Sequence, residues 1–240
     1  MTPIIFMDNL NNYKPENDGN FDANLADNSV DTKAGVSVYF RDIESKLLQH
    51  ISEADAAFGA VAWLTSDSII SALARLSYVS VIVQKEDFLR PDMGASNNWK
   101  KELRQKYSAL KCGLTRHSFQ NILGSVSVAS DPSIEPVRCV GNHNRDKKPA
   151  FPRMHNKFLV FAKVTSGETE HEPKIIEPYA VWTGSFNFTK NATNSLENAL
   201  YITEQLIVNA FFNEYGQIAA MSEPLDWISD WAEPEWRIGT

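Results

Sequence analysis

An imidazole and an ammonium group stand two residues apart at His155 and Lys157, directly before the apolar run at residues 158–161. Such a run is typical of a buried strand, and side chains two positions apart along a strand project to the same side. His155 could therefore act as a nucleophile or proton carrier while Lys157 supplies fixed positive charge. The pair predicts a site for an anionic substrate at the start of this strand.

A second polar segment follows residues 179–182, which we interpret as another strand. Gly184 permits a close approach of the backbone, and Ser185, Asn187 and nearby backbone amides can donate hydrogen bonds to an anionic oxygen. If the two strands end at the same edge of a sheet, these groups meet His155 and Lys157. The combined set suits phosphoryl transfer and requires no metal ion.

Together, His155-Asn156-Lys157 and Gly184-Ser185-Phe186-Asn187-Phe188-Thr189-Lys190, with Glu197-Asn198 beyond them, resemble the phospholipase D superfamily, whose signature is H-x-K-x4-D-x6-G-S-x-N. The similarity is greatest to its small bacterial nucleases and covers about residues 36–215. It implies an α/β fold, a mixed β-sheet sandwiched by helices, with one copy of the motif per chain. It also implies a metal-independent phosphodiesterase without a cofactor, and a nuclease that cleaves DNA or RNA, with DNA preferred.

The resemblance further implies a mechanism in which His155 attacks phosphorus to form a phosphohistidine and a second histidine protonates the leaving oxygen. Lys157, Ser185 and Asn187 would hold the non-bridging oxygens. Glu197 would accept a hydrogen bond from the other ring nitrogen of His155 and fix its tautomer; alternatively, Glu197 is a surface carboxylate before a strand. Because the chain has one motif copy, the resemblance implies a homodimer in which two subunits share one site.

Two features depart from the signature. Ala162 stands where the superfamily has aspartate, which leaves full activity in question. The interval between the two motif halves is about 15 residues longer than in the signature, and we assign the excess to a lengthened hairpin at residues 167–178. The other histidines are interpreted as structural or solvated, although His143 or His117 could supply the acid in a monomer. No His, Cys or Asp grouping has metal-ligand spacing.

The net charge of −7 hides a strongly basic middle segment. Residues 85–163 carry 15 Lys and Arg against 7 Asp and Glu, or +8, whereas residues 1–84 carry −6 and residues 164–240 carry −9. A local positive field suits a polyanionic substrate, although a solvated basic face is the alternative. Six cations of a basic helix and a Pro-broken loop are the candidate phosphate contacts: Lys100, Lys101, Arg104, Arg145, Lys147 and Lys148.

The hydrophobic pattern predicts alternating strands and helices from residue 36 onward. Strands are expected at residues 36–40, 58–64, 79–83, 157–164, 179–182 and 198–203. Helices are expected at residues 43–51, 67–76, 99–110 and 204–221, the second of them capped by Ser66 or Asp67. We divide the chain into a flexible acidic extension (1–34), a catalytic domain (35–222) and a Trp-rich tail (223–240) that packs on the domain.

Other features bear on location and on competing functions. No apolar run reaches the length of a membrane span, the first residues lack a basic leader, and Cys112 and Cys139 are expected to be reduced. Two glycosylation sequons, at Asn187 and Asn191, fall within the candidate site, so we expect a cytoplasmic protein that does not act at a membrane. The alternatives are a phospholipase or phosphatidyl transferase, and a catalytically weakened nucleic-acid-binding module.

Overall fold

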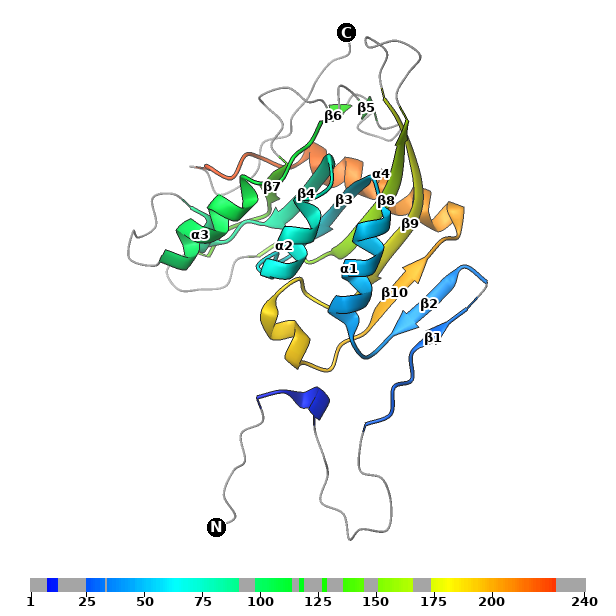
Figure 1. Cartoon of the computed structure of the whole chain (residues 1–240). Coiled ribbons are helices and arrows are strands. Elements are labelled where there is room, and N and C mark those ends of the chain that lie inside the picture. The colour runs from blue at the N-terminus through cyan, green and yellow to red at the C-terminus, as the bar shows by residue number, and fades with distance from the viewer. Residues whose placement is uncertain are drawn as a thin grey trace, which may run out of the picture.

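The computed structural model describes residues 8–12, 25–32, 34–90, 98–113, 117–118, 127–128, 136–144, 151–165 and 174–227. Within these residues an eight-stranded sheet has the order β1-β2-β10-β9-β8-β3-β4-β7 (Figure 1). Its strands are β1 (Val30–Asp31), β2 (Val36–Tyr39), β3 (Ala56–Val61), β4 (Tyr78–Gln84), β7 (Val137–Val140), β8 (Lys157–Thr165), β9 (Ile175–Gly184) and β10 (Ala199–Ile202). Strands β3, β4 and β7 are parallel and the other pairs are antiparallel, which confirms the expected mixed sheet.

Helices cover both faces of the sheet. Three of them, α1 (Ile43–Glu53), α2 (Asp67–Leu73) and α3 (Asn98–Tyr107), pack into one apolar cluster, and α4 (Gln205–Ala220) packs into a second. Figure 1 shows α1, α2 and α3 in front of the sheet and α4 behind it. Short 3-10 turns lie at η1 (Leu10–Asn12), η2 (Asp87–Leu89) and η3 (Lys190–Asn194), and a separate two-stranded ribbon joins β5 (His117–Ser118) to β6 (Ser127–Val128).

The central strands read as continuous apolar runs because both of their faces are covered. In β3, Ala57 and Val61 contribute to the cluster under α1, α2 and α3, while Phe58 and Ala60 contribute to the cluster under α4. All six residues of β3 are buried. The sheet therefore forms the middle layer of three, and its position is fixed by burial on both sides.

Local sequence signals set several element ends. The expected cap of α2 is Ser66, whose hydroxyl accepts a hydrogen bond from the Ile69 backbone. The helix ends at Leu73, earlier than expected, and β9 begins at Ile175, inside the segment that we assigned to a loop insertion. The insertion does lengthen the β8–β9 hairpin, since the two strands stay paired out to Thr165 and Ile175.

The segments outside the expected catalytic domain are partly described. Strand β1, which belongs to the proposed N-terminal extension, pairs with β2 at the edge of the sheet. Trp227 of the proposed tail is buried, whereas Trp231 and Trp236 lie outside the described residues. In the part of the chain that the structure describes, no helix has the length and apolar character needed to cross a membrane.

Candidate active site

The two motif segments lie at one edge of the sheet because β8 begins where β9 ends. Phe158, the second residue of β8, pairs with Thr183, the residue before the end of β9. Adjacent strands are about 4.8 Å apart, so Lys157 and Gly184 are neighbours across the ladder. The end of β3 and the start of β10 reach the same edge through the pairs Val61 with Lys157 and Ala199 with Gly184. The expected convergence of strand ends is confirmed.

His155 and Lys157 are in direct contact at this edge. The Lys157 ammonium lies 3.2 Å from Nδ1 and 3.4 Å from Nε2 of His155, and it donates to the His155 carbonyl at 3.0 Å. The indole ring of Trp63, two residues after β3, stands edge-on to the imidazole at a centroid distance of 5.5 Å and an angle of 83°. The imidazole is exposed to solvent and the lysine is half-buried.

The surroundings lower the pKa of both groups. Desolvation lowers the pKa of His155, and the positive charges of Lys157 and Arg153 lower it further. Desolvation also lowers the pKa of Lys157, against the opposing effect of the Glu197 carboxylate. A lowered pKa keeps the imidazole neutral to lower pH and leaves a ring nitrogen with a free lone pair, which nucleophilic attack requires.

Ser185 follows β9 directly and joins the site to the start of β10. Its hydroxyl donates to the Glu197 carboxylate and accepts from the Asn198 backbone at 3.0 Å, while its own backbone N–H donates to the Asn198 carbonyl at 3.0 Å. Gly184 makes this junction possible, since a Cβ at that position would collide with the Asn198 carbonyl and the Ala199 backbone. The close approach that we expected from Gly184 is therefore to β10.

Glu197 differs from the expectation in its hydrogen-bond partner. We expected its carboxylate to accept from a ring nitrogen of His155, but it accepts from the Ser185 hydroxyl. It still acts on the pair at the start of β8 through its charge, which raises the pKa of Lys157. A half-buried carboxylate held by Ser185 is more than a bare surface group, although its interaction with His155 is indirect.

Asn187 lines a cleft that lies beside these residues. The cleft has a volume of about 540 Å³ and is lined by Trp63, Thr65, Phe88, Trp99, Asn187, Thr189, Asn191, Ala192, Ser195 and Glu197. The Asn187 side-chain oxygen is buried and has no hydrogen-bond partner among the described residues, an uncommon state for a buried polar atom. His155 and Lys157 lie outside the cleft lining, yet Trp63 and Glu197 connect them to it.

A second cavity, of about 490 Å³, lies between η1 and the start of α1 and carries none of the candidate catalytic residues. Among the described residues no cluster of three or more His, Cys, Asp or Glu side chains could hold a metal ion.

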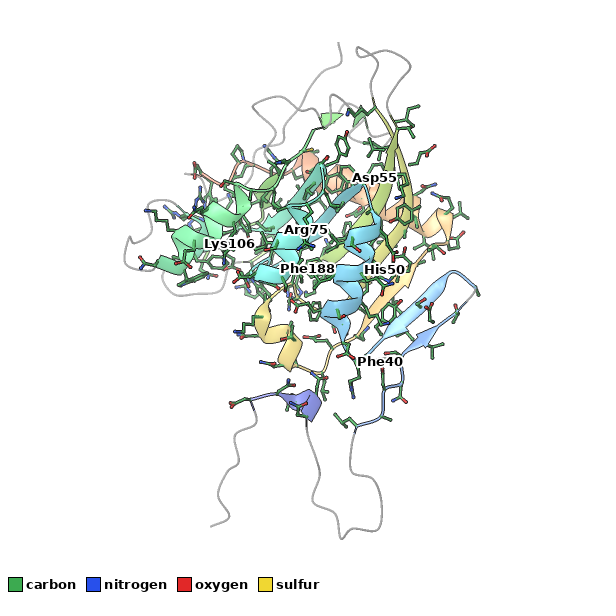
Figure 2. The ribbon with its side chains drawn as sticks, viewed as in Figure 1. Phe40, His50, Asp55, Arg75, Lys106 and Phe188 are labelled. Atoms are coloured by element: carbon green, nitrogen blue, oxygen red, sulfur yellow. The ribbon has the colours of Figure 1, made fainter. Side chains whose placement is uncertain are left out.

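Ala162, at the position of the motif aspartate, lies far from this edge. It is fully buried in the apolar cluster under α4, five residues along β8 from Lys157, which corresponds to about 16 Å of extended strand. The strand has a bulge between Phe161 and Ala162, and the Ala162 carbonyl accepts from the Asp55 backbone at 3.2 Å. In Figure 2, Asp55, which binds the backbone of Ala162, lies above Phe188, the residue after Asn187. A side chain at position 162 cannot contact a phosphate held by Lys157.

The candidate phosphate-binding residues separate into three groups. Lys100 and Lys101 lie on the first turns of α3 and form no ion pair within the described part of the chain. Arg104 donates to the Leu89 carbonyl and pairs with Asp226, so its guanidinium already has intramolecular partners. Arg145, Lys147 and Lys148 lie outside the described residues.

The remaining histidines are placed as follows. His50 stacks on Tyr201 at 3.7 Å between ring centroids, as expected of a structural residue (labelled in Figure 2). His143 contacts the Arg90 guanidinium at 3.3 Å. His117 lies in β5, and His171 falls outside the described residues.

Sequence reasoning missed two residues of the site. Trp63 was assigned to a buried strand, but β3 ends at Val61 and the indole turns toward His155. The sequence placed Arg153 only in the Pro-broken basic loop, whereas its charge lowers the pKa of the His155 imidazole. Its position two residues before His155 was the available signal.

No protein family model matches the chain. It is 34% identical over 234 residues to uncharacterized protein L381 of Acanthamoeba polyphaga mimivirus, a match that covers 92% of this chain and 75% of that protein. This chain belongs to the L381 family. The mimiviral relative thus covers both motif halves and most of the sequence between and around them, and its name assigns no activity.

Solved structures similar to this chain include two bacterial proteins. The first is Nuc from Salmonella typhimurium, a phospholipase D family member, with a TM-score of 0.47 and 16% identity over 81% of this chain and 98% of its own. The second is NucT from Helicobacter pylori, with a TM-score of 0.47 and 15% identity over 79% and 98%. Phospholipase D is also the superfamily that the motifs of this chain resemble.

Proposed function

We propose that this protein is a metal-independent phosphodiesterase of the phospholipase D type that cleaves nucleic acid. The observation that carries the proposal is the contact between the His155 imidazole and the Lys157 ammonium at the start of β8, beside Ser185 at the end of β9. This arrangement combines a nucleophile of lowered pKa with a fixed positive charge and a hydroxyl. The resemblance to small bacterial nucleases favours nucleic acid, and DNA over RNA, as the substrate.

The proposed reaction has two steps. In the first, a ring nitrogen of His155 forms a bond to phosphorus, the phosphorus bond to the leaving oxygen breaks, and a second imidazole gives its proton to that oxygen. In the second, water attacks phosphorus and gives a proton to the second imidazole while the nitrogen–phosphorus bond breaks. Lys157 stabilises the negative charge of the non-bridging oxygens in both transition states. Ser185 and Asn187 hold these oxygens in position. The products are a phosphomonoester and a free hydroxyl.

A homodimer would supply the second imidazole. Each chain has one H-x-K segment, and the reaction needs one imidazole on each side of phosphorus. We propose that His155 of two subunits face each other across a two-fold axis and form one composite site. His143 is a weaker source of the acid, because its ring already contacts the Arg90 guanidinium.

The decisive test offers purified protein, in the presence of EDTA, labelled single-stranded DNA, duplex DNA, RNA and phosphatidylcholine vesicles. We expect cleavage of nucleic acid that continues in EDTA, and a loss of about a thousandfold in the His155→Ala variant. His143→Ala is the matched control and keeps the wild-type rate. An absolute requirement for added divalent metal would refute the mechanism. Hydrolysis of the vesicles alone would point to a phospholipase, and binding without cleavage would point to a nucleic-acid-binding module.

A mixed dimer tests the shared site. One wild-type chain and one His155→Ala chain, carrying different tags, are purified together and assayed against the wild-type dimer. A composite site predicts near-complete loss of activity, because each mixed dimer keeps one of the two required imidazoles. About half of the wild-type rate would show that each chain works independently. We propose that the protein acts in the cytoplasm, where neither sequon is glycosylated.

A further inference from the structure

The cleft beside the candidate active site is rich in aromatic side chains. Trp63, Phe88 and Trp99 come from three separate segments, namely the residues after β3, the turn η2 and the first turn of α3, and all three line the cleft. Trp99 is 47% exposed, although exposed tryptophan is uncommon on protein surfaces. Trp99 lies on the first turn of α3, and two lysines follow it directly. A role in packing alone is therefore a poor explanation for a tryptophan at this position.

Specific contacts hold these rings without burying them. The Trp63 indole N–H donates to the Glu86 carboxylate at 3.1 Å, and its ring meets the His155 imidazole edge-on. The Phe88 and Trp99 rings are 5.3 Å apart between centroids and inclined at 43°. Both Trp63 and Phe88 are half-buried. The cleft therefore presents aromatic surface that is fixed in place and still accessible to a planar ligand.

Polar groups surround the aromatic surface in a way that suits a nucleotide. Thr65, Thr189 and Asn191 line the cleft and can exchange hydrogen bonds with the edge of a base. Asn187, whose side-chain oxygen has no partner among the described residues, also lines the cleft. The cleft volume of about 540 Å³ is within the range of small-molecule sites, which run from about 300 to 1,000 Å³.

We propose that this cleft binds an unpaired nucleobase next to the scissile phosphate, and that Trp99 is its stacking surface. The proposal rests on the proposed function, since His155 and Lys157 would hold the phosphate while the cleft holds the adjoining base. A base within a duplex has both faces stacked and cannot enter such a cleft without leaving the helix. The protein therefore prefers single-stranded nucleic acid, and Lys100 and Lys101, which follow Trp99 on α3, lie where the strand would continue.

A binding experiment tests the cleft without relying on catalysis. The probe is a short oligothymidylate that carries one 2-aminopurine, a base whose fluorescence is quenched by stacking, and the protein is the full chain with His155→Ala. We expect quenching on binding and an affinity about tenfold lower when Trp99→Ala is added. Trp99→Phe, which keeps an aromatic face, restores most of the affinity. Leu206→Ala, a change at a 79% exposed apolar residue on α4, is the control and leaves binding unchanged.

A cleavage experiment separates the failure of this inference from the failure of the proposed function. Wild-type protein is offered one labelled strand as single-stranded DNA, as a duplex, and with every base replaced by an abasic analogue. We expect the single strand to be cleaved fastest, and Trp99→Ala to lower the ratio of its rate to that of the abasic strand by about tenfold.

The outcomes are distinct. Equal rates on single strand and duplex, with no effect of Trp99→Ala on quenching or on that ratio, would overturn the base site while leaving the phosphodiesterase intact. Trp99-dependent quenching without any cleavage would support the base site and refute the proposed function. Trp99-dependent binding of phosphatidylcholine vesicles, with no binding of the oligonucleotide, would overturn the proposal in favour of a lipid. Unfolding of Trp99→Ala is detected by circular dichroism, and Trp99→Phe then carries the test.

Discussion

Restoring the motif aspartate through Ala162→Asp is expected to destabilise this protein without increasing its activity. Ala162 is fully buried among apolar side chains under α4, so the introduced carboxyl would either remain charged without solvation or take up a proton. Protonating an aspartate of ordinary pKa 3.9 at pH 7 costs about 4 kcal/mol, which bounds the pH-dependent part of the penalty from above. Domains are stable by about 5–15 kcal/mol in total, so this is a severe change.

The penalty should depend on pH in a defined direction. Burial raises the folded-state pKa of the introduced aspartate above its unfolded value, so the loss of stability is full at neutral pH and shrinks as pH falls toward the unfolded pKa. At pH 5 the bound is about 1.5 kcal/mol. For a chain of this size each kcal/mol shifts Tm by about 2–4 °C, so we expect this part to lower Tm by up to about 8–16 °C at pH 7 and by up to about 3–6 °C at pH 5, in addition to a pH-independent cost of burying a neutral polar side chain.

Thermal unfolding followed by circular dichroism at both pH values measures this effect. Ala210→Asp places the same side chain at an exposed position of α4 and should cost about 0.5 kcal/mol. Ala162→Asn is the neutral control, whose cost should not change with pH. A Tm for Ala162→Asp equal to that of Ala210→Asp would show that position 162 is solvated. A clear gain in cleavage rate at temperatures below the melting range would show that the motif aspartate acts directly. It would contradict the argument that position 162 lies too far from Lys157, about 16 Å along β8, to contact the substrate.

Two further predictions concern the site itself. Arg153→Gln removes a positive charge that lowers the pKa of His155, so this pKa rises and the acidic limb of the profile of kcat/KM against pH moves to higher pH. Lys163→Gln, at the far end of β8, should leave the acidic limb in place. An unmoved limb for Arg153→Gln would contradict the electrostatic argument. Glu197→Gln and Ser185→Ala each lower kcat. Because the carboxylate and the hydroxyl share a hydrogen bond, the fold loss of kcat in the double variant should be smaller than the product of the two single losses. A loss equal to that product in steady-state rates would show that the two residues act separately.

The sequence was sufficient to predict the elements that carry the site. The apolar runs before Lys157 and around residues 179–182 have the length and composition of buried strands, and burial on both faces leaves few other conformations for them. The same holds for β3 and β4, where both faces are covered by helices. The pattern alone therefore predicts that His155 and Ser185 lie at one edge of the sheet, provided that their strands are neighbours.

Contacts between groups distant in sequence could not be predicted in the same way. The hydrogen bond between Ser185 and Glu197 depends on how β10 returns beside β9, and a choice between Ser185 and His155 as the partner of Glu197 requires that geometry. The intramolecular partners of Arg104 have a similar origin, since Leu89 lies 15 residues before Arg104 and Asp226 lies 122 residues after it. A charge pattern shows how many cations a segment has, and the fold determines which of them face other groups.

The charge distribution then decides how an acidic chain could hold an anionic substrate. Part of the +8 carried by residues 85–163 is neutralised within the fold, because Arg104, Lys106 and Lys163 each pair with an aspartate among the described residues (Lys106 is labelled in Figure 2). Exposed charges are screened beyond about 10 Å at 0.1 M salt, so a carboxylate of residues 164–240 influences a phosphate at Lys157 only where it lies close by, as Glu197 does. Fewer cations then remain to contact the backbone of a strand than the sequence carries, and the salt dependence of binding, which scales with their number, should be shallower than all 15 would give. Affinity that does not come from charge must come from contact with the bases, and the aromatic cleft beside Lys157 is the surface that can supply it.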